Sequence, residues 1–360
     1  MKNNLKPIGN TLPARCLAAA YGCAVMFRNR WYDTHRHHQF FPSAPTISVG
    51  GIHAGGTGKT PLTALIAEYL LTKRHLEVAI LSRGYGRRCK EPVLIQPYQD
   101  ADWTEVGDEP AMIHASLPQT LLGVGASRTD SCYNILNNGQ VTADRLVFVL
   151  DDGFQHRRIA RHLDIVCLPP MERKPHLIPA GYLREPVKNM RRADLACIIA
   201  SKNDLQAVKW TQSYIQSQLG SGFPIIILLS RPFEWVNLQT GEKRKRLKEG
   251  NWGLISGIAH PQRFIKTVKN MGIFPTHTSV FPDHHVFTRN EIESILKQNT
   301  TGIMTTEKDA SRMRTLKLVN RKEIWYLKIS LEFSDTMARD TFFKKIDSIL
   351  SFSRNRRNPS

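Results

Sequence analysis

Cysteine is scarce in this sequence: there are six among 360 residues, and no two of them form a C-x-x-C pair. That pair is the spacing on which many zinc and redox motifs are built, so neither kind of site has support here. A chain this long with so few cysteines fits a reducing compartment, where thiols behave as small buried apolar side chains. The hydrophobic fraction of 41% and the charged fraction of 22% are typical of a globular protein with a sizeable core.

Acidic residues are few relative to basic ones. The 31 Asp and Glu residues stand against 50 Lys and Arg residues, which leaves a net charge of +19. Such an excess predicts an anionic partner: nucleic acid, an anionic membrane surface or a phosphorylated substrate. The sequence has no basic platform interleaved with aromatic residues, the pattern typical of single-strand binders. We therefore expect no nucleic-acid partner.

The N-terminal region lacks a hydrophobic run of membrane-spanning length. Its most apolar stretch, CLAAAYGCAVMF at residues 16–27, has 12 residues, which span roughly 18 Å as a helix against a bilayer core of about 30 Å. Three interpretations stay open: a secretory signal that begins with Lys2 and Lys6, a core helix, and a helix lying on the cytoplasmic membrane face. The last is favoured because basic residues such as Arg15 and Arg28 flank the stretch, and each adds about 1 kcal/mol against anionic lipid.

Short apolar runs alternate with helical patterns along most of the chain, which predicts an α/β fold with a parallel sheet covered on both faces. The predicted strands are 46–49, 78–82, 120–125, 145–152, 164–168, 195–201 and 224–230. A change to polar, turn-rich composition near residue 232 indicates a domain boundary. We expect an N-terminal membrane-associated segment (1–40) and a nucleotide-binding core (41–231). A hairpin or linker (232–251), a smaller α/β domain (252–346) and a basic tail (347–360) follow.

A glycine-rich segment, GGIHAGGTGKTP at residues 50–61, resembles the phosphate-binding pattern G-x-x-x-x-G-K-[ST] except that His53 stands in place of the first glycine. A phosphate site needs close backbone approach, a helix N-terminus aimed at the anion, and a lysine. The strand before this segment and the helix predicted after it provide that setting. The predicted nucleotide-binding residues are Gly55, Gly56, Thr57, Gly58, Lys59 and Thr60.

A second acidic signal follows about 90 residues later, where Asp151 and Asp152 end an apolar strand. Carboxylates at that position hold Mg²⁺ or its water in nucleoside triphosphatases. The sequence therefore predicts a nucleoside triphosphate with Mg²⁺, held by Thr60 and by Asp151 or Asp152. The segment Ser201-Lys202-Asn203-Asp204 is one substitution away from a guanine-binding motif, which leaves a regulatory GTPase or metallochaperone as an alternative. A helix N-cap is the favoured interpretation of that segment.

These motifs together resemble one family, the tetraacyldisaccharide 4'-kinases that act in lipid A synthesis in Gram-negative bacteria. The blocks that carry the resemblance are GGTGKTP (55–61), LSRGYGRR (81–88), VGDEPAMI (106–113), VLDDGFQHRRIARHLDIV (149–166), IPAGYLREP (178–186), SGIAHPQRF (256–264), FPDHH (281–285) and TTEKDA (305–310). The missing first glycine is the form usual in that family. The sequence departs from the family at Gly51, where Asn is usual, and at Tyr182, where Pro is usual.

The resemblance implies transfer of the ATP γ-phosphate to the 4'-hydroxyl of a tetraacylated glucosamine disaccharide 1-phosphate, with Mg²⁺ as cofactor. It implies that Lys59 bridges the β- and γ-phosphates and that Asp108 and His284 form a catalytic pair across an interdomain cleft, with Glu109 as metal or secondary support. The basic loop with Arg83, Arg87 and Arg88 is either a binder of the substrate's 1-phosphate or a solvated face. A lipid substrate implies work at the cytoplasmic face of the inner membrane, and we expect a monomer.

Overall fold

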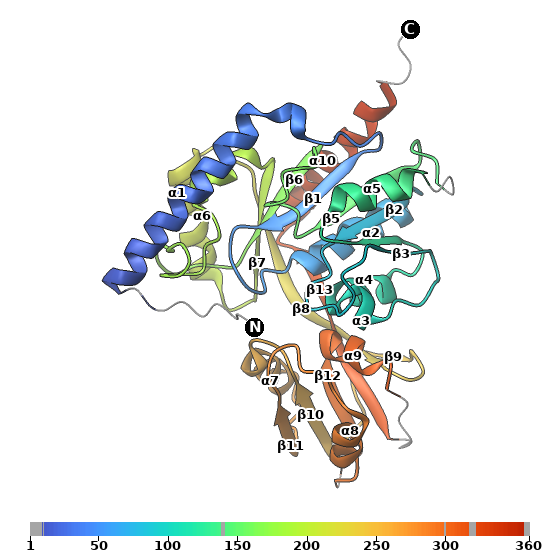
Figure 1. Cartoon of the computed structure of the whole chain (residues 1–360). Helices are drawn as coiled ribbons and strands as arrows, with labels where there is room; N and C mark the ends of the chain where they lie inside the picture. Colours follow the sequence, from blue (N-terminus) through green and yellow to red (C-terminus); the bar gives the residue numbers. More distant parts are fainter. Residues whose placement is uncertain (1–8, 10, 138–140, 299, 317–321, 356–360) are drawn as a thin grey trace.

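The computed structural model describes residues 9, 11–137, 141–298, 300–316 and 322–355, and thirteen strands of these residues form one sheet (Figure 1). A block of eight strands makes up most of it, and within this block only the β3–β4 pair is antiparallel. In sheet order its strands are β8 (Ile225–Asn237), β7 (Leu195–Ala200), β6 (Leu163–Leu168), β1 (Thr46–Gly51), β5 (Leu146–Asp151), β2 (Glu77–Ser82), β4 (Leu121–Val124) and β3 (Val93–Ile95). The predicted α/β class with a mostly parallel sheet is confirmed.

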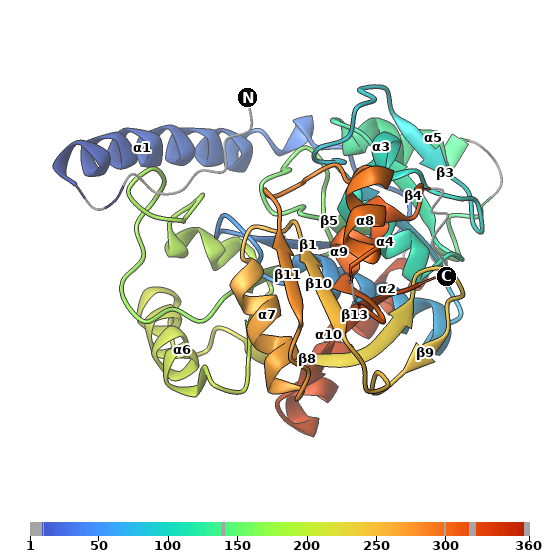
Figure 2. The ribbon, with the colours of Figure 1, turned by 90° about the horizontal axis from the view of Figure 1, so that it is seen from below.

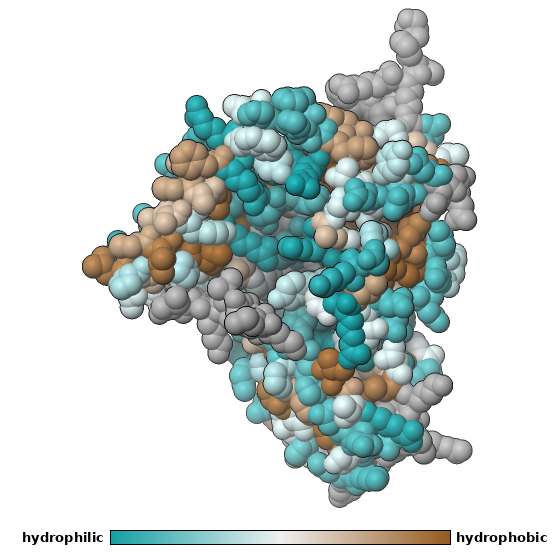
Figure 3. Space-filling view, viewed as in Figure 1, coloured by the Kyte–Doolittle hydropathy of each residue, from teal (hydrophilic) through white to brown (hydrophobic). Residues whose placement is uncertain are grey.

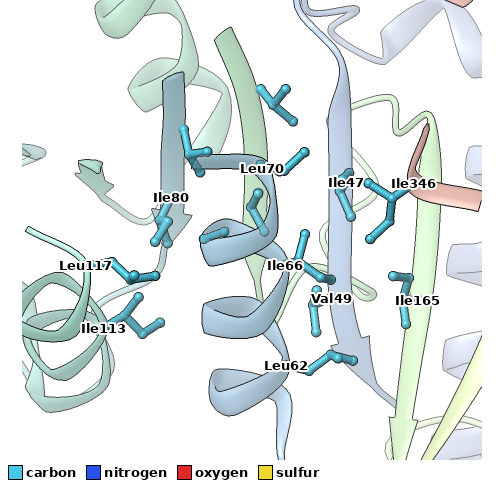
Figure 4. Packing of buried hydrophobic residues seen from close by; sticks show 14 of the residues in the cluster. Ile47, Val49, Leu62, Ile66, Leu70, Ile80, Ile113, Leu117, Ile165 and Ile346 are labelled. Carbon is cyan, nitrogen blue, oxygen red and sulfur yellow. The ribbon is translucent and has the colours of Figure 1, made fainter. Parts of the chain in front are cut away.

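Helices cover both faces of this block, as the apolar strands require. They are α2 (Lys59–Lys73), α3 (Trp103–Val106), α4 (Asp108–Ser116), α5 (Arg128–Asn137), α6 (Leu205–Leu219), α10 (Thr336–Asn355) and the 3-10 helices η1 (Arg36–His38) and η2 (Val187–Arg192). Figure 4 shows how α2 lies against the sheet through Leu62, Ile66 and Leu70, all fully buried. Because Lys59 is the first residue of α2, this packing fixes the end of the helix that the site uses.

Four further strands form a second parallel group at one end of the sheet, drawn in the lower part of Figure 1. It consists of β11 (His277–Val280), β10 (Trp252–Ser256), β12 (Gly302–Thr306) and β13 (Glu323–Phe333), with helices α7 (Pro261–Asn270), α8 (Arg289–Leu296) and α9 (Glu307–Met313). A core of its own, around Trp252, Leu254 and Met304, lies on this group. Its helices and the loop after β11 carry the second half of the site.

One long antiparallel pair joins the two groups, β8 with β13. The predicted strand 224–230 runs on to Asn237 because β13 supplies a partner from Leu228 to Asn237. After β8 the chain turns at Gly241, whose φ is +72°, and returns as β9 (Lys243–Arg244). The domain boundaries remain a prediction, but β8 crosses residues 231 and 232 without a break. The two sides of the site are therefore connected through continuous strands.

Helix α1 (Leu12–Thr34) lies along the outside of the molecule in Figures 1 and 2. One stripe, with Ala14, Ala18 and Val25, is buried. In the part of the chain that the structure describes, no helix combines the length and hydropathy needed to cross a bilayer. Lys2 and Lys6 lie outside the described residues. At the other end, α10 continues to Asn355, so the predicted basic tail begins as helix and its residues 356–360 lie outside the described part.

Candidate functional site

A cleft of about 2230 Å³ lies between the two strand groups. One wall carries the glycine-rich loop, the end of β5 and the start of α4; the other carries residues of α7, α9 and the loop after β11. In the first group the lining residues follow the carboxyl ends of neighbouring parallel strands. This is the edge at which open α/β sheets bind ligands.

The glycine-rich loop connects the buried strand β1 to the N-terminus of α2. Gly55 and Gly58 have φ values of +108° and +78°, conformations that side-chain-bearing residues rarely adopt. A Cβ at Gly58 would lie 2.5 Å from Ile199, whereas a Cβ at Gly55 or Gly56 would meet nothing within 4 Å. The loop is therefore packed at Gly58 and open in its middle, where backbone N–H groups can approach a phosphate.

Lys59 and Asp152 form an ion pair at the mouth of this loop. Lys59 Nζ lies 3.7 Å from Asp152 Oδ1, and Arg184 donates to Asp152 Oδ2 at 2.9 Å. Burial would raise the pKa of the Asp152 carboxyl, but the charges of Lys59 and Arg184 outweigh it and the pKa lies below its ordinary value. Asp152 therefore stays ionised and holds both cations beside the loop.

Asp151, the last residue of β5, is 3% exposed and accepts a hydrogen bond from Thr63 of α2 at 3.1 Å. Burial, together with the negative charges of Glu109 and Asp152, raises the pKa of the Asp151 carboxyl to about 7. Three carboxylates thus crowd one region that also contains buried Thr60. A divalent cation would relieve that repulsion.

Asp108 and His284 lie together although they come from opposite sides of the cleft. Asp108 Oδ2 is 2.9 Å from His284 Nδ1, and His284 takes a positive φ of 59° in the loop after β11. Burial would raise the pKa of the Asp108 carboxyl, but His284, Lys308 and Arg312 lower it below its ordinary value. The side chain of Asp108 is 5% exposed and that of His284 is 21% exposed, so the imidazole is the more accessible member.

Glu109 and the residues of α9 complete this side of the site. Lys308 donates to Glu109 Oε1 at 3.2 Å and lies 3.7 Å from Asp108 Oδ2. Arg312, 1% exposed, lies 3.6 Å from the same Asp108 oxygen and donates to the carbonyl of Gly257. The structure thus brings Lys59, Glu109, Asp151, Asp152 and His284 to one cleft, with Asp108 hydrogen-bonded to His284, in two clusters around Asp152 and Asp108.

Several basic residues of this cleft have no predicted role, among them Arg128, Arg184 and Lys308. Arg128 is 5% exposed, and its Nε has no hydrogen-bond partner among the described residues. It follows β4, and Arg83 follows β2, so both lie at the carboxyl edge of the sheet. A survey of basic residues after each predicted strand would have found Arg128.

The remaining predicted features lie apart from these clusters or have other contacts. Arg87 donates to the carbonyls of Glu91 and Lys90, so its guanidinium holds its own loop, while Arg83 lines the cleft. Asp204 stands at the N-cap position of α6 and accepts from the backbone and hydroxyl of Ser201. The segment therefore begins a helix, as the cap interpretation expects, although the Asp204 side chain makes no hydrogen bond to the N–H groups of α6.

The residues present fit a nucleotide with Mg²⁺. The Thr57 hydroxyl is buried within the loop and has no partner in the described part of the chain. No three His, Cys, Asp or Glu side chains among the described residues are arranged to hold a metal by themselves. Mg²⁺ at such sites takes one or two protein ligands and completes its shell with phosphate oxygens and water. Thr60 and the crowded carboxylates provide that partial set.

Comparisons with known proteins point to one family. A family model described as Tetraacyldisaccharide-1-P 4'-kinase matches residues 12–348. A tetraacyldisaccharide 4'-kinase of Chlorobaculum tepidum is 34% identical over 89% of this chain and 93% of its own, and that of Aquifex aeolicus is 31% identical over 91% and 94%. A crystal structure of LpxK from Aquifex aeolicus in complex with ATP superposes with a TM-score of 0.73 at 28% identity, covering 93% of this chain and 97% of that one. These matches favour a kinase over a regulatory GTPase.

Proposed function

The chain belongs to the tetraacyldisaccharide-1-P 4'-kinase family, and we propose that it transfers the γ-phosphate of ATP to the 4'-hydroxyl of a tetraacyldisaccharide 1-phosphate in lipid A biosynthesis. The observation that carries the proposal is the cleft itself. It combines the glycine-rich loop and Lys59 with the Asp108–His284 pair, whose two members come from opposite sides of the cleft. A phosphate donor and a hydroxyl acceptor need these two elements at opposite ends of one reaction path.

The first strand group acts in this proposal as a P-loop core. The N–H groups of residues 55–58 and the N-terminus of α2 surround the β- and γ-phosphates, and Lys59 neutralises their charge. Lys59 is released from Asp152 toward the phosphates, while Arg184 keeps Asp152 paired. Positioning and charge neutralisation supply most of the rate in such transfers.

Mg²⁺ would be held by Thr60 and Asp151, with Glu109 and Asp152 near them. It supplies charge neutralisation between the phosphates when it is bound. Asp151 suits the role because it is crowded by like charges. Asp152 is already paired with Arg184 and Lys59.

The Asp108–His284 pair receives the proton of the sugar hydroxyl. The carboxylate and the imidazole share a hydrogen bond of 2.9 Å, which orients the ring and stabilises the protonated pair. Both halves of the cleft come from one chain, which is consistent with a monomeric enzyme.

We further propose that α1 docks the enzyme on the cytoplasmic face of the inner membrane, where a four-chain lipid substrate resides. Figure 3 shows apolar surface along this helix, and its exposed apolar side chains include Leu12 (74%), Leu17 (57%) and Phe27 (70%). Exposed Arg15 and Arg30 lie on the same helix, and each adds about 1 kcal/mol beside anionic lipid.

A double substitution, Leu17→Glu with Phe27→Glu, tests this docking because neither residue is buried against the core. In flotation with vesicles containing phosphatidylglycerol, we expect the wild type to float and the variant to stay in solution. Leu205→Glu, at an exposed leucine of α6, is the matched control and should float. Equal flotation of all three proteins would refute docking through α1.

The proposed reaction is tested with γ-labelled ATP and purified tetraacyldisaccharide 1-phosphate in detergent micelles. We expect label in the lipid with the wild type and none with Lys59→Ala. If ATP or GTP were hydrolysed while the lipid stayed unlabelled, the acceptor would be wrong and a nucleotide hydrolase would replace the kinase.

A further inference from the structure

A short ladder ties the open half of the glycine-rich loop to the segment around Tyr182. The backbone N–H of Ala54 donates to the Tyr182 carbonyl at 2.7 Å, and the backbone N–H of Arg184 donates to the Ile52 carbonyl at 2.6 Å. His53 and Leu183 form an antiparallel bridge between these bonds. The loop that leaves β1 is thus paired, before it reaches Gly55, with a segment about 130 residues further along the chain.

Two side chains reinforce this ladder. The rings of His53 and Tyr182 stack with centroids 5.3 Å apart and an interplanar angle of 18°. Burial, with the nearby charges of Lys59 and Arg184, lowers the pKa of His53 to about 4, so the ring is neutral at pH 7. These are two positions at which the sequence departs from a usual pattern: His53 stands at the first glycine of the phosphate-binding pattern, and Tyr182 replaces a proline.

The ring stack contributes to the loop conformation because the middle of the loop makes few packing contacts. Gly55 and Gly56 are exposed, and their α-carbons face open space. One end of the loop is fixed where Gly58 packs on Ile199. The other end depends on residues 52–54, and therefore on the ladder and its ring stack.

We propose that the Tyr182–His53 stack is a positioning element that holds residues 52–56 ready for the phosphates of ATP. The inference rests on the proposed kinase function, whose phosphate donor this loop binds. Tyr182 acts through His53 and the loop backbone. An aromatic pair of this kind corresponds to a change in affinity of about 3- to 10-fold.

The test compares Tyr182→Ala, His53→Ala and the double variant by steady-state kinetics and by ATP binding in calorimetry. We expect each single variant to raise the KM for ATP about 3- to 10-fold, with kcat and the KM for lipid nearly unchanged. The double variant should resemble the singles because both remove one interaction. Tyr182→Phe keeps the ring and should restore wild-type values, and Tyr133→Ala, at an exposed tyrosine outside the cleft, should have no effect.

An unchanged KM and Kd for ATP in both single variants would overturn the proposal. So would additive effects, or a Tyr182→Phe variant as weak as Tyr182→Ala, which would assign the role to the hydroxyl. If a thermal melt shows that Tyr182→Ala is not folded, the ATP affinity of His53→Ala alone tests the proposal. If the wild type binds ATP but does not phosphorylate the lipid, the proposed kinase function is wrong. The calorimetric Kd values of the variants would still test whether the stack positions the loop for ATP.

Discussion

Asp108 Oδ2 lies 2.9 Å from His284 Nδ1 although 176 positions separate the two residues in the chain. Asp108 begins α4 on one side of the cleft, and His284 belongs to the loop after β11 on the other. Helices α4 and α9 pack together here, and the Ser311 hydroxyl of α9 donates to the Asp108 carbonyl. The pair is therefore already assembled in this structure.

Asp108→Asn and His284→Ala should each lower kcat about 100-fold or more, because each removes one half of the unit that takes the hydroxyl proton. The double variant should be no slower than the slower single variant, since groups that act as a unit are not additive. Rapid-quench phosphorylation of the lipid measures both effects.

His277→Ala is the matched control for this pair, since His277 is exposed on the edge strand β11. Its kcat should equal that of the wild type. Losses in the double variant that multiply those of the singles would mean that Asp108 and His284 act separately.

Arg184→Met should weaken ATP binding about 10-fold or more. The hydrogen bond from Arg184 to Asp152 is charge-assisted. Without it, Asp152 would pair with Lys59 alone and hold that lysine away from the phosphates. Calorimetric titration with MgATP measures the loss. Arg191→Met, at an exposed arginine of η2, should bind ATP as the wild type does, and equal affinity in both variants would contradict the role of Arg184.

The sequence predicted the site best where local pattern and strand direction coincide. Asp151 and Asp152 lie at the end of an apolar strand, and Lys59 follows another through the glycine-rich loop. Parallel strands place their carboxyl ends at one edge of the sheet. Asp108 and His284 had no such signal. Their proximity depends on how α4 meets α9, and they were predicted only through the family resemblance.

The fold was less predictable where tertiary contacts override local pattern. Strand β8 continues through polar residues to Asn237 because β13 pairs with it. Helix α1 extends beyond its apolar stretch because Asn29 donates to Glu185 and Arg157 donates to the Asn29 carbonyl. Neither partner can be identified from the periodicity of α1 itself.

Arg312→Met should destabilise the protein by about 3–5 kcal/mol, because it leaves the buried carboxylates of Asp108 and Asp309 without their shared cation. Urea unfolding followed by circular dichroism measures the change. Arg339→Met removes an exposed arginine from α10 and should shift stability by less than about 0.5 kcal/mol. A similar small shift for Arg312→Met would show that this arginine does not stabilise the buried carboxylates.

Glu185→Gln should give a pH-dependent loss of stability. The Glu185 carboxylate is 1% exposed and accepts from Arg192, Asn29 and Gln155. Burial would raise its pKa, but Arg192 and the other donors lower it below the ordinary 4.5. A carboxyl with a depressed folded pKa stabilises the protein above its unfolded pKa and loses that contribution as the pH falls through the folded value.

The wild type should therefore exceed Glu185→Gln by about 3 kcal/mol at pH 7, and the gap should shrink only below pH 4.5. Urea midpoints measured at intervals from pH 7 to pH 3 follow this difference. Glu332→Gln removes a half-exposed partner of Arg231 and should change stability by under about 1 kcal/mol throughout. A gap that closes above pH 4.5 would mean that the Glu185 pKa is raised, and that the buried network around Asn29 tolerates a neutral side chain.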